Sequence, residues 1–207
     1  MRKVNYKPES LSPDAPIGFL VLAAGHSRRF GRCKLSATIQ CRSPSVKQTV
    51  LGAVLDTITS LKAPVCVVTS AYQTAVIDIV TDRPVQVSLM AKDSDGMGQS
   101  IAYGVRATQH WRGWIVCLGD MPWVARDTYE KVLAQANRGA QQAAPYFEGK
   151  RGHPVYFSGS YGKALMTLSG DTGAASIIEP AVITPVDIED THIFDDVDRP
   201  EDLAGSR

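Results

Sequence analysis

Residues 24–34 form a basic loop that contains two glycines and directly follows the apolar run 17–23. Four Lys and Arg side chains fall between Arg28 and Lys34, and no Asp or Glu occurs between Asp14 and Asp56. Small residues allow backbone N–H groups to approach an anion, and Arg and Lys side chains neutralise phosphate oxygens. The loop therefore predicts a polyphosphate site at the end of the first strand.

The loop does not follow either common nucleotide motif. Gly25 and Gly31 are separated by five residues, and Gly31-Arg32 stands where a Walker A sequence has Gly-Lys-Ser/Thr. The pattern also differs from G-x-G-x-x-G. From the residues alone, a solvated basic loop with ordinary turn glycines remains an alternative.

A second candidate group is Asp120, which follows the apolar run 114–118 and Gly119. A buried strand ending at residue 118 would place this carboxylate at the strand's carboxyl end, facing the basic loop. Mg²⁺ in proteins is held by one or two carboxylates together with phosphate oxygens and water. Gly-Asp-Met-Pro is equally typical of a turn in which Asp accepts backbone hydrogen bonds.

The elements that must position these groups alternate between apolar runs and helical stretches. This alternation predicts right-handed crossovers and an α/β, Rossmann-like three-layer sandwich with a mainly parallel sheet and helices on both faces. Ligands of such sheets bind at the carboxyl ends of the strands. The predicted strands are 17–23, 65–68, 85–89, 114–118, 143–147, 154–157 and 181–186, and the predicted helices are 45–61, 71–80, 97–110, 126–137, 161–168 and 173–178.

Composition narrows the class of protein. The 207 residues carry a net charge of +1, which argues against a surface built for nucleic acid. No apolar run approaches the ~20 residues of a spanning helix, so we expect no membrane partner and a cytoplasmic location. We predict a flexible tail over 1–16 and one domain over 17–207. The four cysteines lack the spacing of a zinc site.

The pattern Leu-Ala-Ala-Gly-x-Ser-x-Arg-x-Gly-x-x-Lys at residues 22–34 resembles the signature of the molybdopterin cytidylyl- and guanylyltransferase family. Further likenesses follow in order along residues 17–203. They are Gly-Met-Gly-x-Ser at 96–100, Leu-Gly-Asp-Met-Pro at 118–122, Arg-Gly-His-Pro at 151–154, Gly-Asp-Thr-Gly-Ala at 170–174 and Asp-Val-Asp-Arg-Pro-Glu-Asp at 196–202.

This resemblance implies a nucleotidyltransferase that moves CMP from CTP to molybdopterin with Mg²⁺ and releases pyrophosphate. Arg28, Lys34 and Asp120 would carry catalysis, Asp120 and Asp198 would hold the metal, and His153 would contact the acceptor. A molybdoenzyme would receive the product. The nucleotide would contact Leu22, Ala23, Ala24, Gly25, Ser27, Gly31, Gly96 and Ser100.

Several alternatives stay open at this point. Ala23-Ala24-Gly25 favours CTP, because the relatives that transfer GMP read Ala-Gly-Gly there, but GTP or another acceptor remains possible since residues 35–42 depart from the family pattern. A carrier of the molybdenum cofactor without turnover is a second alternative. Asp198 could instead cap a short helix, with Asp196 as the other candidate ligand. A lone histidine such as His153 is more often structural.

Overall fold

The computed structural model describes residues 12, 14–25, 30–39 and 48–204. Its centre is an eight-stranded sheet with the order β10-β7-β9-β6-β1-β4-β5, to which β8 adds by pairing with β7. β9 runs antiparallel to both of its neighbours, while the pairs β1–β4, β1–β6, β4–β5 and β10–β7 are parallel. The sheet strands are β1 (Ile17–Leu22), β4 (Val65–Ser70), β5 (Gln86–Met90), β6 (Gly113–Leu118), β7 (Gln142–Phe147), β8 (Lys150–Arg151), β9 (Val155–Ser158) and β10 (Ile183–Asp187).

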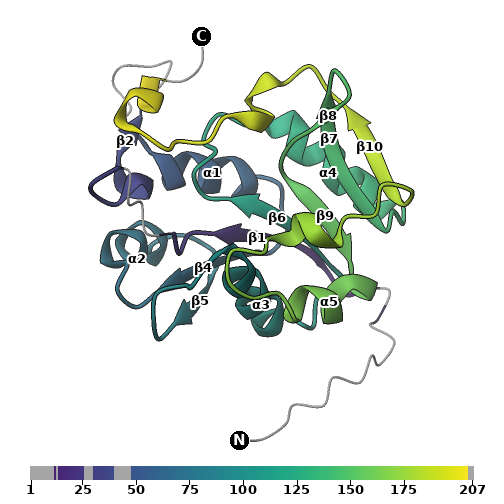
Figure 1. Cartoon of the computed structure of the whole chain (residues 1–207), viewed down its shortest axis with the longest axis horizontal. Coiled ribbons are helices and arrows are strands. Elements are labelled where there is room, and N and C mark those ends of the chain that lie inside the picture. Colours follow the sequence, from purple (N-terminus) through teal and green to yellow (C-terminus); the bar gives the residue numbers. More distant parts are fainter. Residues whose placement is uncertain (1–11, 13, 26–29, 40–47, 205–207) are drawn as a thin grey trace, which may run out of the picture.

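Helices cover both faces of this sheet, as Figure 1 shows. One hydrophobic cluster joins the sheet to α1 (Val50–Thr59), α2 (Thr74–Thr81) and α4 (Arg126–Asn137). The other cluster joins it to α3 (Met97–Ala107) and α5 (Gly162–Met166). This arrangement confirms the predicted α/β, Rossmann-like sandwich with a mainly parallel sheet.

The first strand, β1, lies in the middle of the sheet. β1 pairs with β4 on one side and β6 on the other, and its residues Phe19, Leu20 and Val21 are fully buried. Continuous apolar runs of this kind are typical of parallel strands that are covered on both faces. The carboxyl ends of β1 and β6 lie side by side, because Leu22 is in register with Leu118. The residues that follow these two strands are thereby brought together.

The structure corrects three predicted elements. The predicted helix 45–61 starts late: Gln48–Thr49 is strand β3, which pairs with β2 (Thr38–Ile39), and α1 begins only at Val50, where the Thr49 side chain caps it. The predicted helix 173–178 is a 3₁₀ helix, Ala174–Ile177, and helix 161–168 is reduced to α5 after a 3₁₀ turn. The short strands β2, β3 and β8 were not predicted, since a strand of two residues is too short to show an alternation of apolar and polar side chains.

The polar C-terminal segment folds into two 3₁₀ helices, Thr191–Phe194 and Pro200–Ala204. None of the described helices is long and apolar enough to cross a membrane. The predicted tail, residues 1–16, falls largely outside the described residues, so its boundary stays a prediction.

Candidate active site

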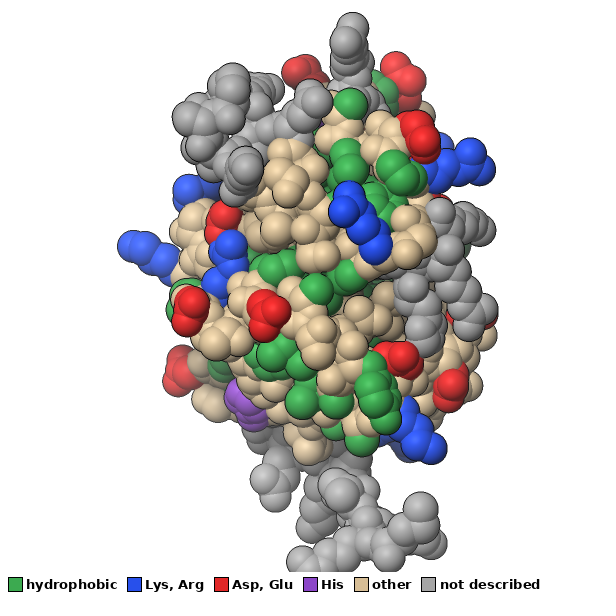
Figure 2. All heavy atoms as spheres, turned by 90° about the vertical axis from the view of Figure 1, so that its left-hand side faces the viewer, with side chains coloured by type: hydrophobic (Ala, Val, Ile, Leu, Met, Phe, Trp, Pro, Cys, Tyr) green, Lys and Arg blue, Asp and Glu red, His purple; other side chains and the backbone are tan. Residues whose placement is uncertain are grey.

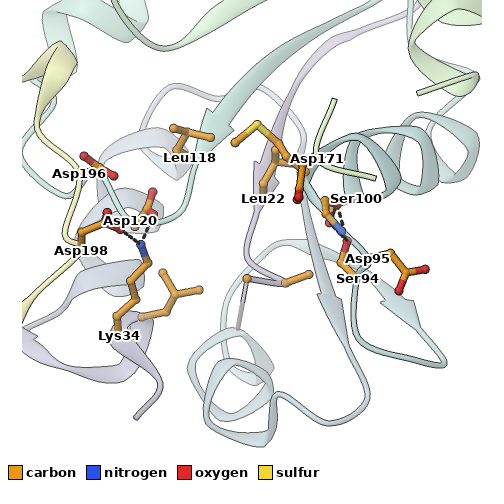
Figure 3. A pocket seen from close by; sticks show the side chains of 15 residues that line it. Leu22, Lys34, Ser94, Asp95, Ser100, Leu118, Asp120, Asp171, Asp196 and Asp198 are labelled. Carbon is orange, nitrogen blue, oxygen red and sulfur yellow. Dashed lines mark hydrogen bonds and ion pairs between the residues drawn. The ribbon is translucent and has the colours of Figure 1, made fainter. Parts of the chain in front are cut away.

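A cavity of about 740 Å³ opens at the carboxyl ends of β1 and β6. Figure 3 shows it between two walls, with Leu22 and Leu118 at its back. One wall carries charged side chains from the first loop, from the end of β6 and from the C-terminal segment. The other is built from the connection between β5 and α3. The lining residues are Leu22, Ala24, Gly25, Lys34, Leu35, Ser94, Asp95, Gly96, Met97, Ser100, Leu118, Asp120, Asp171, Asp196 and Asp198.

The charged wall is organised around Lys34 (Figure 3). Its Nζ lies 2.6 Å from Asp120 Oδ2 and 3.0 Å from Asp198 Oδ1, and only 13% of its side chain is exposed. These three groups are far apart in the sequence and come from the 3₁₀ helix Lys34–Ser36, the end of β6 and the C-terminal segment. A partly buried ammonium between two carboxylates is a charge-assisted contact that fixes all three side chains.

Backbone contacts explain why Asp120 and Asp198 meet. Gly119 N–H donates to the Leu22 carbonyl at 3.0 Å, and a Cβ on Gly119 would come within 2.8 Å of that oxygen. Only glycine therefore allows the loop after β6 to lie so close to β1. Val197 N–H then donates to the Asp120 carbonyl at 2.9 Å, which attaches the C-terminal segment beside Asp120.

Asp202 fixes the other side of Asp198. Its Oδ2 accepts hydrogen bonds from the backbone N–H of Asp198 at 2.9 Å and of Arg199 at 2.7 Å. The turn that carries Asp198 is held by this side chain from four residues further along the chain. Asp202 was not among the predicted site residues, although it closes the Asp-Arg-Pro-Glu-Asp sequence that the family likeness includes.

The charged wall has more negative than positive charge. Burial lowers the pKa of the Lys34 ammonium, but Asp120 and Asp198 raise it by more, so the net pKa lies above its ordinary value. The pKa of Asp196 is raised by its own burial and then by the charges of Asp120 and Asp198. Three neighbouring carboxylates with one ammonium leave a potential that favours a further cation.

The opposite wall consists mostly of backbone and hydroxyl groups, with the acidic side chains of Asp95 and Asp171 beside them. Ser100 Oγ donates to Ser94 Oγ at 2.8 Å, and Ser94 Oγ donates to the Gly96 carbonyl at 2.5 Å. Gly96 has φ +150, and a Cβ there would come within 2.3 Å of the Gly170 backbone. Gly98 N–H also donates to the Gly170 carbonyl at 2.9 Å. The glycines at 96 and 98 therefore let α3 begin against the 169–172 segment.

His153 is not among the residues that line the cavity. Its backbone N–H donates to the Ile193 carbonyl at 3.1 Å, and a Cβ on Gly152 would come within 2.6 Å of the Ile193 side chain. The Nδ1 atom is buried and has no hydrogen-bond partner among the described residues. Burial and the nearby Arg151 cation lower the pKa of His153, against an opposing effect of Asp120. The Arg-Gly-His-Pro sequence thus packs on the segment that leads to Asp196 and Asp198.

The structure brings together part of the predicted site. Of the predicted residues, Leu22, Ala24, Gly25, Lys34, Gly96, Ser100, Asp120 and Asp198 line the cavity, as does the alternative ligand Asp196. Ala23 instead belongs to the hydrophobic core, where its carbonyl accepts a hydrogen bond from Thr69 Oγ1 at 3.1 Å. Gly31 is exposed, with φ +74, and is not on the cavity wall. Ser27 and Arg28 lie outside the described residues.

Six lining residues were not predicted. Leu118 and Asp171 belong to segments that carried the family likeness, so the sequence held a signal for them. Met97 lies within Gly-Met-Gly, while Leu35 follows Lys34 directly. Ser94 and Asp95 had no sequence signal beyond their place before α3. Their positions on the wall depend on the turn from β5 into that helix.

Most of the chain matches a known protein family. The family described as the MobA-like NTP transferase domain matches residues 19–186. No curated protein matches the chain.

Solved structures with the same fold include Rv0371c from Mycobacterium tuberculosis H37Rv, with 22% identity, 93% of this chain and 98% of that chain covered, and a TM-score of 0.75. The same protein in complex with manganese gives 21% identity, 84% and 88% coverage, and a TM-score of 0.67. A nucleotidyl transferase from Methanothermobacter thermautotroptrophicus is 19% identical, with 90% of this chain and 94% of that chain covered, and a TM-score of 0.73. Molybdopterin-guanine dinucleotide biosynthesis protein A from Archaeoglobus fulgidus is 17% identical, with 90% of this chain and 94% of that chain covered, and a TM-score of 0.60.

Proposed function

Because the chain belongs to the MobA-like NTP transferase domain family, we propose that it transfers CMP from CTP to molybdopterin, with Mg²⁺, and releases pyrophosphate. The observation that carries this proposal is the contact of Lys34 with both Asp120 and Asp198 on the cavity wall. This contact brings a cation suited to bind phosphate next to two carboxylates suited to bind a divalent metal.

The reaction needs little from the protein as an acid or base. A phosphate monoester has a second pKa of about 6, so the acceptor is mostly dianionic near neutral pH. Its oxygen forms a bond to the α-phosphorus of the triphosphate, and the bond from that phosphorus to the bridging oxygen of the β-phosphate breaks. The electron pair leaves with pyrophosphate. The obstacle is to bring the triphosphate and the phosphorylated acceptor, both polyanions, into line for the reaction. A cationic loop and a partly buried ammonium overcome it, because they orient the phosphates and neutralise their charge.

In this proposal Lys34 contacts the triphosphate and Arg28 adds a second cation from the same loop. The carboxylates of Asp120 and Asp198 orient the Lys34 ammonium and limit its rotation. The backbone at Ala24 and Gly25 lies on the cavity wall, where N–H groups suit an anion. The wall at Gly96 and Ser100 would receive the nucleoside.

The residues present fit a magnesium ion. Asp120 and Asp198 offer carboxylate oxygens, and Asp196 lies on the same wall with a pKa raised by its burial and then by its negative neighbours. Among the described residues no group of three or more His, Cys, Asp and Glu side chains forms a metal site by itself. A metal held by one or two carboxylates plus phosphate oxygens is typical of Mg²⁺ with a nucleotide. When bound, it would neutralise charge on the phosphates.

The preference for CTP rests on Ala24. This residue lines the cavity, while its side chain is 2% exposed and packs in the hydrophobic cluster on the α3 side of the sheet. We infer that a glycine at this position would leave a wider cavity, so that the alanine favours the smaller cytosine base. His153 is proposed to act on the acceptor side, since it lies near Asp120 and its Nδ1 has no partner among the described residues.

The test is pyrophosphate release measured for each nucleoside triphosphate against molybdopterin and against sugar phosphates, with and without Mg²⁺. We expect turnover with CTP, molybdopterin and Mg²⁺ above all other combinations. Turnover with GTP would overturn the base assignment, and turnover only with a sugar phosphate would overturn the acceptor. Binding of the product without pyrophosphate release under any condition would support the carrier alternative.

Lys34→Met tests the role of the ammonium in this reaction. The methionine keeps the length and the packing of the lysine stem but removes the charge that we place on the triphosphate. We expect turnover to fall by about 10²-fold or more, while the circular dichroism spectrum stays unchanged. Lys163→Met, on α5, is the matched control, since it removes an exposed lysine that does not line the cavity. Unchanged pyrophosphate release by Lys34→Met would remove this residue from the mechanism.

A further inference from the structure

The strand β5 forms one edge of the sheet, and nothing in the described part of the chain pairs with its outer side. Val87 and Leu89 on this strand are 39% and 46% exposed. Figure 2, which views the side of the molecule where Figure 1 places β5 and α2, shows hydrophobic side chains gathered on the lower part of this face. The run from Val85 to Ala91 contains no charged residue and no proline. Edge strands are usually protected by such residues, so this one is suited to pairing.

The direction of the backbone groups on β5 follows from its pairing with β4. Ala71 N–H donates to the Met90 carbonyl at 2.9 Å, and the parallel register sets Ser70 opposite Met90. In a parallel pair alternate residues point their peptide groups at the neighbouring strand. The peptide groups of Gln86, Ser88 and Met90 therefore face β4, and those of Val85, Val87 and Leu89 face outward.

Two of the outward groups already have partners. The Tyr103 hydroxyl donates to the Leu89 carbonyl at 2.9 Å, and Val85 N–H donates to the Arg83 carbonyl at 2.8 Å. The remaining outward groups are the N–H and carbonyl of Val87, the N–H of Leu89 and the carbonyl of Val85.

We propose that β5 pairs antiparallel with β5 of a second copy of this chain, about a two-fold axis at Val87. The N–H and carbonyl of Val87 then bond to the same groups of the other copy. Leu89 N–H meets the Val85 carbonyl of the other copy, and the two occupied groups, the Leu89 carbonyl and the Val85 N–H, face each other. Each group that already has a partner thus lies opposite another such group, and each remaining N–H lies opposite a remaining carbonyl.

The side chains are self-complementary in the same register. Val87 lies opposite Val87, and Leu89 lies opposite Val85, so apolar side chains form one row on one face of the joined sheets. A two-fold axis at Ser88 would instead set Val87 N–H against the occupied Leu89 carbonyl. Two-fold pairing repeats each favourable contact twice, which favours a second copy over a strand of another protein.

The experiment is sedimentation equilibrium of the whole chain over a wide range of concentration. We expect twice the chain mass at high concentration. Val87→Lys places two like charges across the axis, and we expect the dissociation constant of the dimer to rise at least about tenfold. Lys163→Glu, a charge change on α5, is the control and should leave the dimer unchanged. Circular dichroism verifies that each variant is folded.

A charge exchange tests the register. Val87→Glu alone should weaken the dimer as Val87→Lys does. An equimolar mixture of the two variants should form the dimer again, because the axis at Val87 sets the lysine of one copy opposite the glutamate of the other. A wild-type chain that stays monomeric at all concentrations would overturn the proposal, as would a dimer that Val87→Lys leaves intact. Failure of the mixture to form a dimer would overturn the register. None of these outcomes depends on nucleotidyl transfer.

Discussion

The two walls of the cavity are built on different principles. The charged wall holds three side chains from distant parts of the chain, in contacts of 2.6 Å and 3.0 Å around one ammonium. The opposite wall is built mainly from one local segment, in which Gly96 and two serine hydroxyls bond to one another before α3 begins, with the 169–172 segment packed against it. The charged wall depends on long-range packing and charge, and the opposite wall depends mostly on backbone geometry.

This difference indicates that one wall is suited to phosphate and the other to a nucleoside. Charges gathered from separate elements can act on phosphate, because the Lys34 ammonium is held by two carboxylates and does not have to move. A wall made mostly of backbone and hydroxyl groups suits a nucleoside, which offers hydrogen-bonding groups without charge. Substitutions on the charged wall should therefore change turnover, and those on the opposite wall should change folding and nucleotide affinity.

The largest effect is expected for Asp120→Asn. The amide keeps the size of the side chain but removes the charge opposite Lys34 and one oxygen suited to a metal. We expect the rate of pyrophosphate release to fall by about 10²- to 10³-fold. Asp187→Asn, at the exposed end of β10, is the matched control and should keep the full rate. A near-normal rate for Asp120→Asn would remove the carboxylate from the mechanism.

The next largest effect is expected on the opposite wall. Gly96→Ala places a Cβ within 2.3 Å of the Gly170 backbone at φ +150, so both strain and overlap oppose it. We expect a loss of about 2–4 kcal/mol in the free energy of unfolding, measured by urea titration. Gly139→Ala is the control, because it also has positive φ but meets no atom within 4 Å. Equal losses for the two variants would show that contact with Gly170 is unimportant.

Asp202 allows the charged wall to be weakened without touching its lining. Asp202→Ala removes the acceptor for two backbone N–H groups and frees the turn that carries Asp198. We expect kcat to fall about tenfold, since a small misplacement of a functional group is costly. Asp202→Asn keeps an acceptor oxygen and should recover most of kcat. A purely structural role would instead lower the melting temperature of both variants and leave kcat of the folded enzyme unchanged.

The smallest effect concerns pH. The pKa of His153 is lowered in the folded state by burial and by Arg151, so the unfolded chain binds a proton more readily. Its contribution to stability is present above the ordinary pKa of 6.5 and is lost as pH falls through the lower folded value. We expect His153→Gln to flatten the loss of stability below pH 6.5, by at most about 1.4 kcal/mol per pH unit. Identical pH profiles of unfolding for both proteins would contradict this.

Much of the sheet was predictable, because fully buried strands such as β1 and β6 are continuous apolar runs between turn signals. The bounds of α4, Arg126–Asn137, were predicted to the residue. The C-terminal half was harder to predict. Its short strands and 3₁₀ helices are stabilised by contacts with the sheet rather than by local periodicity, so the helix predicted over 173–178 was partly wrong.

The sequence by itself determined the α/β class, the strand end at Leu118, the end of the first strand to within one residue of Leu22, and the residue types gathered after them, because burial patterns and motifs are local properties of the chain. Only the tertiary structure decided that Lys34 lies between Asp120 and Asp198, that Asp202 supports this turn, and that Ala23 faces the core. Lys34 is more than eighty positions away from either carboxylate. The contact of Asp202 depends on the course of the C-terminal turn, and the place of Ala23 depends on which way one side chain after a strand points. These positions are set by the packing of the sheet and its loops, which cannot be deduced from neighbouring residues in the sequence.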